Sequence, residues 1–484
     1  MNKLHISFLI LFLFCGKLLI GNDPTGHSYR YNIKNATEVD ALAHHLKNKI
    51  VHSKTTLTAP GTYYYVSNSG DDNNDGLSPD KAWKTLDKVS NTILNPGDAV
   101  FFKRGELWRG SLHTQAGVSY STYGNGEKPK IFGSRQNYSV KYKWKETGVD
   151  NVYYLDEEIK NDVGVIVFND GVAHTFKKIA GVDGFDGSIS ALRNDLDMYH
   201  HLEESKVYLY SETGNPADRF SSIEVCQKDH IVKIGGDNIT IDNLCIKYGG
   251  AHGIGSGSTN RLHVSNCELG WIGGSILSGT TRYGNAVEIW GGCTDYRVES
   301  CYIYQIYDAG ITHQYKFSGP DEIILMEDIV YRDNLIEYCI YSIEYFLDQS
   351  DTGRNKMKNI LFENNICRFA GYGWGWQRPD KMGMHIQSWP HRNPAENFVI
   401  RGNIFDRSRD KLIYISAEES TSLPRIENNI YIQYRDNNFG FYGENADKTE
   451  FTFDKNIREH LIENEIDRHP VVIYSESPIQ EKIP

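Results

Sequence analysis

A phrase of four residues returns along the chain and constrains its fold more than any other feature of the sequence. In each copy an apolar residue is followed by a polar one, and Asn or a small stand-in takes the third or fourth place. The copies recur every roughly 23 to 38 residues, which is the spacing of stacked structural repeats. They are Ile241–Leu244, Val264–Cys267, Val298–Cys301, Tyr331–Asn334, Phe362–Asn365, Ile400–Asn403 and Ile426–Asn429.

A stack of such units buries the apolar face that a single unit cannot bury, and it exposes a long side wall. Asn at a corner between two strands satisfies backbone groups and bonds to the Asn of the next repeat. We therefore assign a structural role and no chemistry to the Asn column, which consists of Asn334, Asn365, Asn403 and Asn429.

The N-terminus has the pattern of a targeting segment. Lys3 precedes an apolar run over Ile6–Phe14, and Gly21 offers a cleavage point. The run is shorter than the ~20 residues that span a bilayer, which favours a signal peptide over residues 1–21. Lipidation at Cys15 stays open. The mature chain is then exported, to the periplasm, the cell surface or the medium, with residues 22–60 as a leader arm and a short helix near Val39–Leu46.

Charge and cysteine usage exclude several classes of protein. The net charge of -12 argues against a nucleic-acid partner. Of the 8 cysteines one lies in the targeting segment, and the odd remainder without CxxC pairs argues against a disulfide scaffold and a zinc site. Cys267 and Cys301 share one repeat column, so we expect buried thiols there, with a disulfide as the alternative. We predict no metal, no membrane insertion and a monomer.

The start of the mature region resembles a known cap. Residues 64–79 read Tyr-Tyr-Val-Ser-x-Ser-Gly-Asp-Asp-x-Asn-Asp-Gly-x-Ser-Pro, followed by Ala82–Leu86 and Pro96–Val100. This is similar to the N-terminal cap of secreted, pectate-lyase-like proteins. The resemblance implies an all-β, right-handed parallel β-helix and a carbohydrate-active protein, with the cap and first coils over residues 61–134. Ser78 and Pro79 predict a helix start, with Ala82, Leu86 and Val89 on its apolar face.

Residues 135–225 interrupt the repeat rhythm. Val163–Phe168 and Lys206–Tyr210 have the pattern of strands, which predicts a β-rich insertion packed on the stack. Coils then run over residues 226–436, ending near Tyr434. We expect residues 437–484 to cap the far end, because open sheet edges need covering.

The strand after each phrase carries the candidate chemistry. Aligning Gly310–Thr312, Ser342–Glu344 and Gly383–His385 points the middle residue inward and places Thr312, Glu344 and His385 in one outward row. Asn285–Trp290 fits the same pattern with Glu288 outward, although Ser275–Leu277 competes for that rung. Glu288 and Glu344 are then two rungs, roughly 10 Å, apart. That separation suits an inverting glycosidase, which needs ~6.5–9.5 Å between its carboxyl groups.

Asp308 lies between these two glutamates in height, and mutual repulsion is expected to raise at least one carboxyl pKa. His385 is the candidate for binding a hydroxyl or acting as a base, whereas strict alternation points His313 inward. The long loop after Arg368 is rich in aromatic residues, as sugar platforms are. The predicted catalytic residues are Glu288, Asp308, Glu344 and His385, and the predicted substrate-binding residues are Trp290, Thr312, His313, Gln314, Trp374, Trp376, Lys381 and Gln387.

These residues predict a glycoside hydrolase acting on a polysaccharide or oligosaccharide. Two alternatives stay open: a polysaccharide lyase, for which Arg282, Lys316, Arg378 and Lys381 supply cations, and a glycan-binding protein without catalysis. No cofactor is required for hydrolysis. The loop Asp71-x-Asn73-x-Asp75-Gly76 resembles half of a calcium loop but has Ala82 where the bidentate Glu belongs, so a Ca²⁺ site and a plain capping turn are both open.

Overall fold

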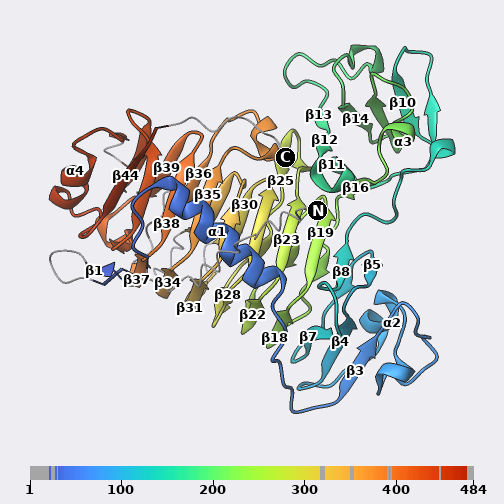
Figure 1. The fold of residues 1–484 in the computed structure, drawn as a ribbon, viewed down its shortest axis with the longest axis horizontal. Helices are drawn as coiled ribbons and strands as arrows, with labels where there is room; N and C mark the ends of the chain where they lie inside the picture. The colour runs from blue at the N-terminus through green and yellow to red at the C-terminus, as the bar shows by residue number, and fades with distance from the viewer. Residues whose placement is uncertain are drawn as a thin grey trace, which may run out of the picture.

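The computed structural model describes residues 21–22, 28–29, 31–316, 322–348, 354–389, 392, 395–445 and 449–476. The predicted signal peptide and Cys15 lie outside this range, apart from Gly21. Three long sheets wind around one apolar core, and each coil contributes one parallel strand to each sheet. Figure 1 shows the coils stacked side by side along the long axis.

Sheet one carries the repeated phrase. Its strands pair in parallel and in register from rung to rung, so that Ile241 lies beside Val264, and Val264 beside Val298. In order it contains β3 (Tyr63–Val66), β4 (Ala99–Lys103), β7 (Ser119–Tyr123), β18 (Ile239–Asp242), β22 (Leu262–Ser265), β28 (Arg297–Glu299), β31 (Leu325–Arg332), β34 (Lys356–Glu363), β37 (Ala395–Arg401) and β40 (Arg425–Glu427), with β21 (Thr259–Asn260) and β27 (Cys293–Thr294) at its side.

Sheets two and three complete each coil. Sheet two contains β5 (Leu107–Arg109), β8 (Lys130–Phe132), β19 (Cys245–Gly249), β23 (Glu268–Ile272), β29 (Tyr302–Ile306), β32 (Leu335–Glu337), β35 (Ile366–Ala370), β38 (Ile404–Ser408), β41 (Ile430–Tyr434) and β44 (Val471–Ser475). Sheet three contains β6 (Leu112–His113), β17 (Val232–Lys233), β20 (Ile254–Ser256), β26 (Val287–Trp290), β30 (Ala309–Tyr315), β33 (Tyr341–Leu347), β36 (Met384–Ser388), β39 (Lys411–Ala417), β42 (Asn438–Glu444) and β43 (Phe451–Thr452).

The repeated phrase forms the corner between sheets one and two. Its third residue has a left-handed backbone in every copy, with φ between 52° and 64°. Asn, Asp and Gly tolerate that conformation best, which explains the composition of this position. The residues are Asn243, Asn266, Ser300, Asp333, Asn364, Gly402 and Asn428.

The fourth residue of the phrase forms the predicted Asn ladder inside the stack. The side-chain amide of Asn334 donates to Oδ1 of Asn365 at 2.9 Å, Asn365 donates to Asn403 at 2.9 Å, and Asn403 donates to Asn429 at 3.0 Å. Asn429 ends the series by donating to Oδ2 of Asp467 at 3.0 Å. The structural role assigned to this column is confirmed.

The ends of the stack depart from the sequence-based boundaries. The expected helix at Ser78 is a 3₁₀ turn over Pro79–Lys81, and the α-helix α2 begins only at Leu86 and ends at Asn91, with Thr85 as its cap. Trp83 breaks the helix because its ring is buried in the core and its backbone bridges to Val66. At the other end β42 and β44 extend the stack beyond Tyr434, and α4 (Ile457–Glu463) follows β42 in the chain and buries Ile457 and Leu461 in the same core.

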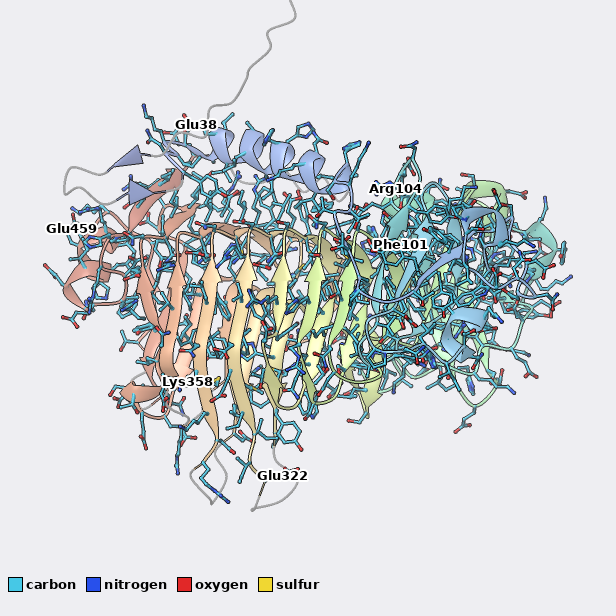
Figure 2. The ribbon with its side chains drawn as sticks, turned by 90° about the horizontal axis from the view of Figure 1, so that it is seen from below. Glu38, Phe101, Arg104, Glu322, Lys358 and Glu459 are labelled. Carbon is cyan, nitrogen blue, oxygen red and sulfur yellow. The ribbon has the colours of Figure 1, made fainter. Side chains whose placement is uncertain are left out.

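The leader arm contains a longer helix than the sequence pattern indicated. Helix α1 (Ala36–Val51) begins after Asn35, whose side chain accepts from the N–H of Glu38 at 3.0 Å. Val39, Ala43 and Ile50 pack against the outer face of sheet two. Figures 1 and 2 show the helix lying lengthwise across the coils. Short strands β1 (Gly21–Asn22) and β2 (Ser28–Tyr29) precede it.

Residues 135–225 form the predicted β-rich insertion, which projects beside the stack in Figure 1. The two strands expected from the sequence are β11 (Val163–Phe168) and β15 (Lys206–Tyr210). One sheet orders β13 (Phe176–Lys178), β14 (Asp197–His201), β15, β10 (Val152–Leu155) and β9 (Trp144–Glu146), and a second orders β12 (Ala173–His174), β11 and β16 (Ile223–Gln227); α3 (Pro216–Arg219) lies beside them.

Four further features from the sequence concern the cysteines, the acidic loop, metal-binding clusters and membrane-spanning helices. Cys267 and Cys301 are buried, free thiols. In the acidic loop Asp71 accepts hydrogen bonds from Asn73, and Asp72 accepts from Lys84 and Thr85, so these oxygens serve a capping turn. Within the described ranges no group of three or more His, Cys, Asp or Glu side chains is arranged to hold a metal ion. None of the described helices is both long and apolar enough to cross a bilayer.

Candidate active site on sheet three

The register of sheet three brings the predicted carboxylates together. Glu288 of β26 lies beside Thr312 of β30, Thr312 beside Glu344 of β33, and Glu344 beside Gln387 of β36. Residues 275–278 form a hairpin, β24 (Ser275–Ser278) with β25 (Thr281–Tyr283), and leave the rung to β26. Glu288 and Glu344 are therefore two rungs apart, roughly 10 Å between backbones.

Glu288 is held in its neutral form by its surroundings. The residue is only 6% exposed, and burial raises its pKa to about 8, with a further contribution from the charge of Asp308. The Asn285 side-chain amide donates to Oε2. At neutral pH Glu288 therefore carries a proton, which is the state required of a general acid.

His252 is a neutral imidazole that lies against Glu288. The backbone N–H of Asn285 donates to Nδ1 of His252 at 3.0 Å, so this nitrogen carries no proton. Burial and the stacked ring of His230 hold the pKa of His252 well below its usual range. Oε2 of Glu288 lies 3.0 Å from the same Nδ1. Because the lowered pKa keeps the His252 ring neutral, this close contact is not an ion pair.

Glu344 is a second buried carboxyl, but its partners favour the ionised form more. Burial raises its pKa to about 8, and the charge of Asp308 adds to the shift. The indole N–H of Trp389 donates to Oε1 at 2.7 Å and opposes it, as does the nearby guanidinium of Arg378. The charge of Glu288 also contributes to the rise, and that contribution vanishes when Glu288 is protonated.

Asp308 sits at the start of the middle rung and acts on both glutamates. Arg378 donates from Nη1 to Oδ1 of Asp308 at 2.8 Å, and from Nε to Asp380 at 2.6 Å. Burial raises the pKa of Asp308 and the Arg378 charge lowers it. Asp308 directly precedes β30, and β30 lies between the strands of Glu288 and Glu344. The negative charge of Asp308 contributes to the raised pKa of both glutamates, and at Glu344 the Trp389 and Arg378 contacts oppose that effect.

Two predicted histidines do not reach this face. His385 is fully buried, contacts Ser342 at 3.1 Å through Nδ1 and stacks on Phe405, so the outward position expected for it is wrong. The alignment slipped because β36 pairs Ile386 with Ile343, which gives the outward place to Gln387. His313 is also buried and contacts the Tyr331 hydroxyl at 2.8 Å, as alternation predicted, so it does not face substrate.

The predicted substrate-binding residues fall into three groups. Trp290 is 42% exposed at the edge of the row, where Gln314 lies beside it. Thr312 and Gln387 are in the row but buried. Trp374 is buried between the insertion and the stack, against Tyr307, because its indole N–H donates to the carbonyl of Gln305 at 2.8 Å, so it cannot stack on a sugar. Trp376 and Lys381 line a cavity to which the carboxylates do not contribute.

Sequence reasoning missed three contacts of the site. Asn285 and His252 touch Glu288, and Trp389 touches Glu344. Asn285 stands three residues before Glu288 on the same segment, a spacing that could have drawn attention to it. His252 comes from the preceding rung, and the Trp389 bond depends on which residue of β36 faces outward. The sequence pattern did not define that register.

Comparisons with known proteins find only distant or partial similarity. No protein-family model matches the sequence. A lacto-N-biosidase of Bifidobacterium longum subsp. longum is 37% identical over 86 residues, which are 16% of this chain and 5% of that protein. The chain thus spans about a twentieth of this curated relative. A structure described as the complex of XylC with xylose aligns with a TM-score of 0.47 at 12% identity, over 85% of this chain and 83% of the other.

A GH136 lacto-N-biosidase from Eubacterium ramulus aligns with a TM-score of 0.42 at 16% identity, over 86% of this chain and 68% of the other. The parallel pairing in all three long sheets, with one strand of each per coil, identifies the architecture. The chain has the right-handed parallel β-helix fold. In this β-helix the carboxylate row occupies sheet three, whereas the Asn ladder lies at the corner between the other two sheets.

Proposed function

We propose that this chain is an exported glycoside hydrolase that cleaves a polysaccharide or oligosaccharide with inversion. The observation that carries the proposal is the pair of buried glutamates two rungs apart on one face, with Asp308 between them. The span of roughly 10 Å between their backbones is compatible with a water molecule between the two side chains. The curated relative that matches over 86 residues is a lacto-N-biosidase, which agrees with this class.

Glu288 is the proposed general acid and Glu344 the proposed base. Glu344 takes a proton from a water molecule while the oxygen of that water bonds to the anomeric carbon. Glu288 gives its proton to the glycosidic oxygen as the bond from that oxygen to the anomeric carbon breaks. The water oxygen thus ends on the sugar and the transferred proton ends on the leaving alcohol. Trp290 is exposed on the same face and is the proposed sugar contact.

Two alternative activities make different predictions. A lyase needs a cation that neutralises a uronate, but Arg378 is already bound to Asp308 and Asp380. The test is digestion of a panel of glycans, neutral and uronate-containing, with product analysis and absorbance in the ultraviolet. We expect new reducing ends, inverted anomers in the first products and no added absorbance. Ultraviolet-absorbing products indicate a lyase, and binding without products from any glycan supports a glycan-binding protein.

Replacing Asp308 is expected to move the alkaline limb of the pH profile. In the unmodified chain kcat/KM falls as Glu288 loses its proton near its pKa of about 8. The Asp308 charge raises that pKa, so Asp308→Asn lowers it, and the limb moves to lower pH by about one unit. The measurement is kcat/KM against pH. Asp87→Asn on the exposed side of α2 is the control, and an unmoved limb in Asp308→Asn contradicts the assignment of Glu288.

A further inference from the structure

A cavity of about 520 Å³ lies between the insertion and the stack, away from the three carboxylates. One wall comes from the insertion, over residues 174–185 and 191–197. The other comes from the loop over residues 372–381, with Gln305, Tyr338 and Arg409. The volume falls in the range of ~300–1,000 Å³ that is usual for small-ligand sites. None of the three carboxylates, Glu288, Asp308 and Glu344, lines this cavity.

The cavity is held open by a fixed set of hydrogen bonds. Gln377 accepts from the backbone N–H of Lys177 at 2.9 Å and from Nη1 of Arg282 at 3.1 Å. Its amide donates to the carbonyl of Thr175 at 3.4 Å. These bonds join the insertion to the loop of the stack, so a ligand meets a site that needs little rearrangement.

Aromatic side chains supply flat apolar faces on both walls. Phe176 of the insertion is 42% exposed, and Trp376 of the loop is half-buried. Arg409 lies 4.5 Å from the centre of a Trp376 ring and 5.8 Å from that of Tyr372. A ring that is partly exposed and also contacts a cation suits a ligand with an apolar face and a negative charge.

The charge of the cavity is opposite to that of the protein. Five cationic side chains line it against two carboxylates, in a chain of net charge -12. Lys177 and Lys178 are paired with Asp162 and Asp197, respectively. Arg282 and Lys381 instead donate to neutral oxygens, those of Gly274, Gly164 and Gln377 for Arg282 and that of Trp376 for Lys381.

We propose that this cavity is a second carbohydrate site, which binds a sugar residue carrying a carboxylate, that is, a uronic acid. The Trp376 and Phe176 rings pack on the faces of sugar rings. The ammonium of Lys381, which donates to a neutral carbonyl, binds the carboxylate. Arg378 belongs to the same loop as Trp376 and Lys381, but its guanidinium is bound to Asp308 on the carboxylate side. Binding in the cavity is independent of hydrolysis.

The test is calorimetric titration of the full-length Glu288→Gln variant with trigalacturonate. This protein binds the ligand without cleaving it, so the result does not depend on the proposed hydrolase activity. We expect a Kd below about 1 mM, with no binding of neutral galactotriose at the same concentration and no competition by acetate. If galactotriose binds equally well, the ligand's charge does not contribute and the proposal of a uronic-acid site is wrong. If acetate competes, the cavity recognises a carboxylate alone and the proposal of a sugar site is wrong. The absence of any trigalacturonate binding overturns the proposal.

Substitutions in the cavity and on sheet three test which of the two sites binds trigalacturonate. Trp376→Ala and Lys381→Ala are each expected to weaken trigalacturonate binding by about tenfold or more. Phe176→Ala, on the exposed rim, is the second aromatic variant in case Trp376→Ala does not fold. Trp290→Ala on the carboxylate face is the matched control and is expected to bind like the parent. If Trp290→Ala loses binding while the cavity variants retain it, the ligand lies on sheet three and the cavity proposal fails, while the proposed hydrolase stands.

Discussion

Glu288→Gln is expected to lower kcat by about 10²–10⁴ while leaving the fold intact. Gln fills the same space, and its oxygen can accept from the Asn285 amide as Oε2 of Glu288 does. It therefore keeps a neutral side chain of the same size and removes the transferable proton. The measurement is release of reducing ends from the substrate found in the glycan panel, with substrate binding measured alongside.

Glu363→Gln is the control, because Glu363 pairs with Arg332 and Arg401 on sheet one. It is expected to keep parental activity. Activity retained by Glu288→Gln rules out this residue as the acid.

Glu288→Gln is also expected to stabilise the protein at pH 8 by about 4 kcal/mol, relative to its effect at pH 4.5. The pKa of Glu288 is about 8 in the folded chain against an ordinary value of 4.5. As pH rises from about 4.5 to about 8 the unfolded chain has lost this proton and the folded chain still binds it, so stability falls across this window. Gln does not titrate. Urea unfolding of both proteins should show the gain at pH 8 and little difference at pH 4.5, whereas an equal difference at both pH values contradicts the raised pKa.

Asn365→Ala is expected to cost about 3 kcal/mol or more in unfolding free energy. The Asn365 side chain is fully buried, donates to the carbonyl of Tyr331 and to Oδ1 of Asn403, and accepts from Asn334. Alanine leaves these buried groups without partners, in a corner that water does not enter. Urea unfolding followed by circular dichroism measures the loss.

Asn68→Ala is the control for this substitution. Asn68 is exposed and its side chain accepts only one long bond, from the N–H of Leu107 at 3.4 Å. A change below about 0.5 kcal/mol is expected there. If both alanine variants lose the same stability, the ladder contributes nothing beyond an ordinary surface amide.

The sequence predicted the features that repeat. The corner phrase needs a left-handed residue in third place, and this requirement restricts the amino acid strongly enough to be read from one chain, as Asn243, Asn364 and Gly402 illustrate. The outward places of Glu288 and Glu344 followed from strand alternation after an inward apolar residue. Both kinds of prediction depend on local geometry alone.

The predictions that were wrong depended on the length of the segment between two strands and on packing between distant elements. The segment between β35 and β36 contains a 3₁₀ turn over Trp374–Gln377, and the register of β36 is set by pairing with β33, so His385 went to the interior and Gln387 to the row. Trp374 looked like a sugar platform, yet the insertion covers it. Composition cannot separate a covered ring from an exposed one, because either position favours a large apolar side chain.

Helix α1 changes how a stack of this kind can come apart. A bare stack of repeats has only neighbour-to-neighbour contacts and frays from its ends. Here one helix touches Tyr302, Leu335, Ile366 and Ile404, which belong to four successive coils, and Asp40 binds both Arg368 and Arg407. The helix cannot stay docked when one of these coils opens. It thereby makes the coils melt together, so the length of the cooperative unit is set by a segment that lies outside the repeat.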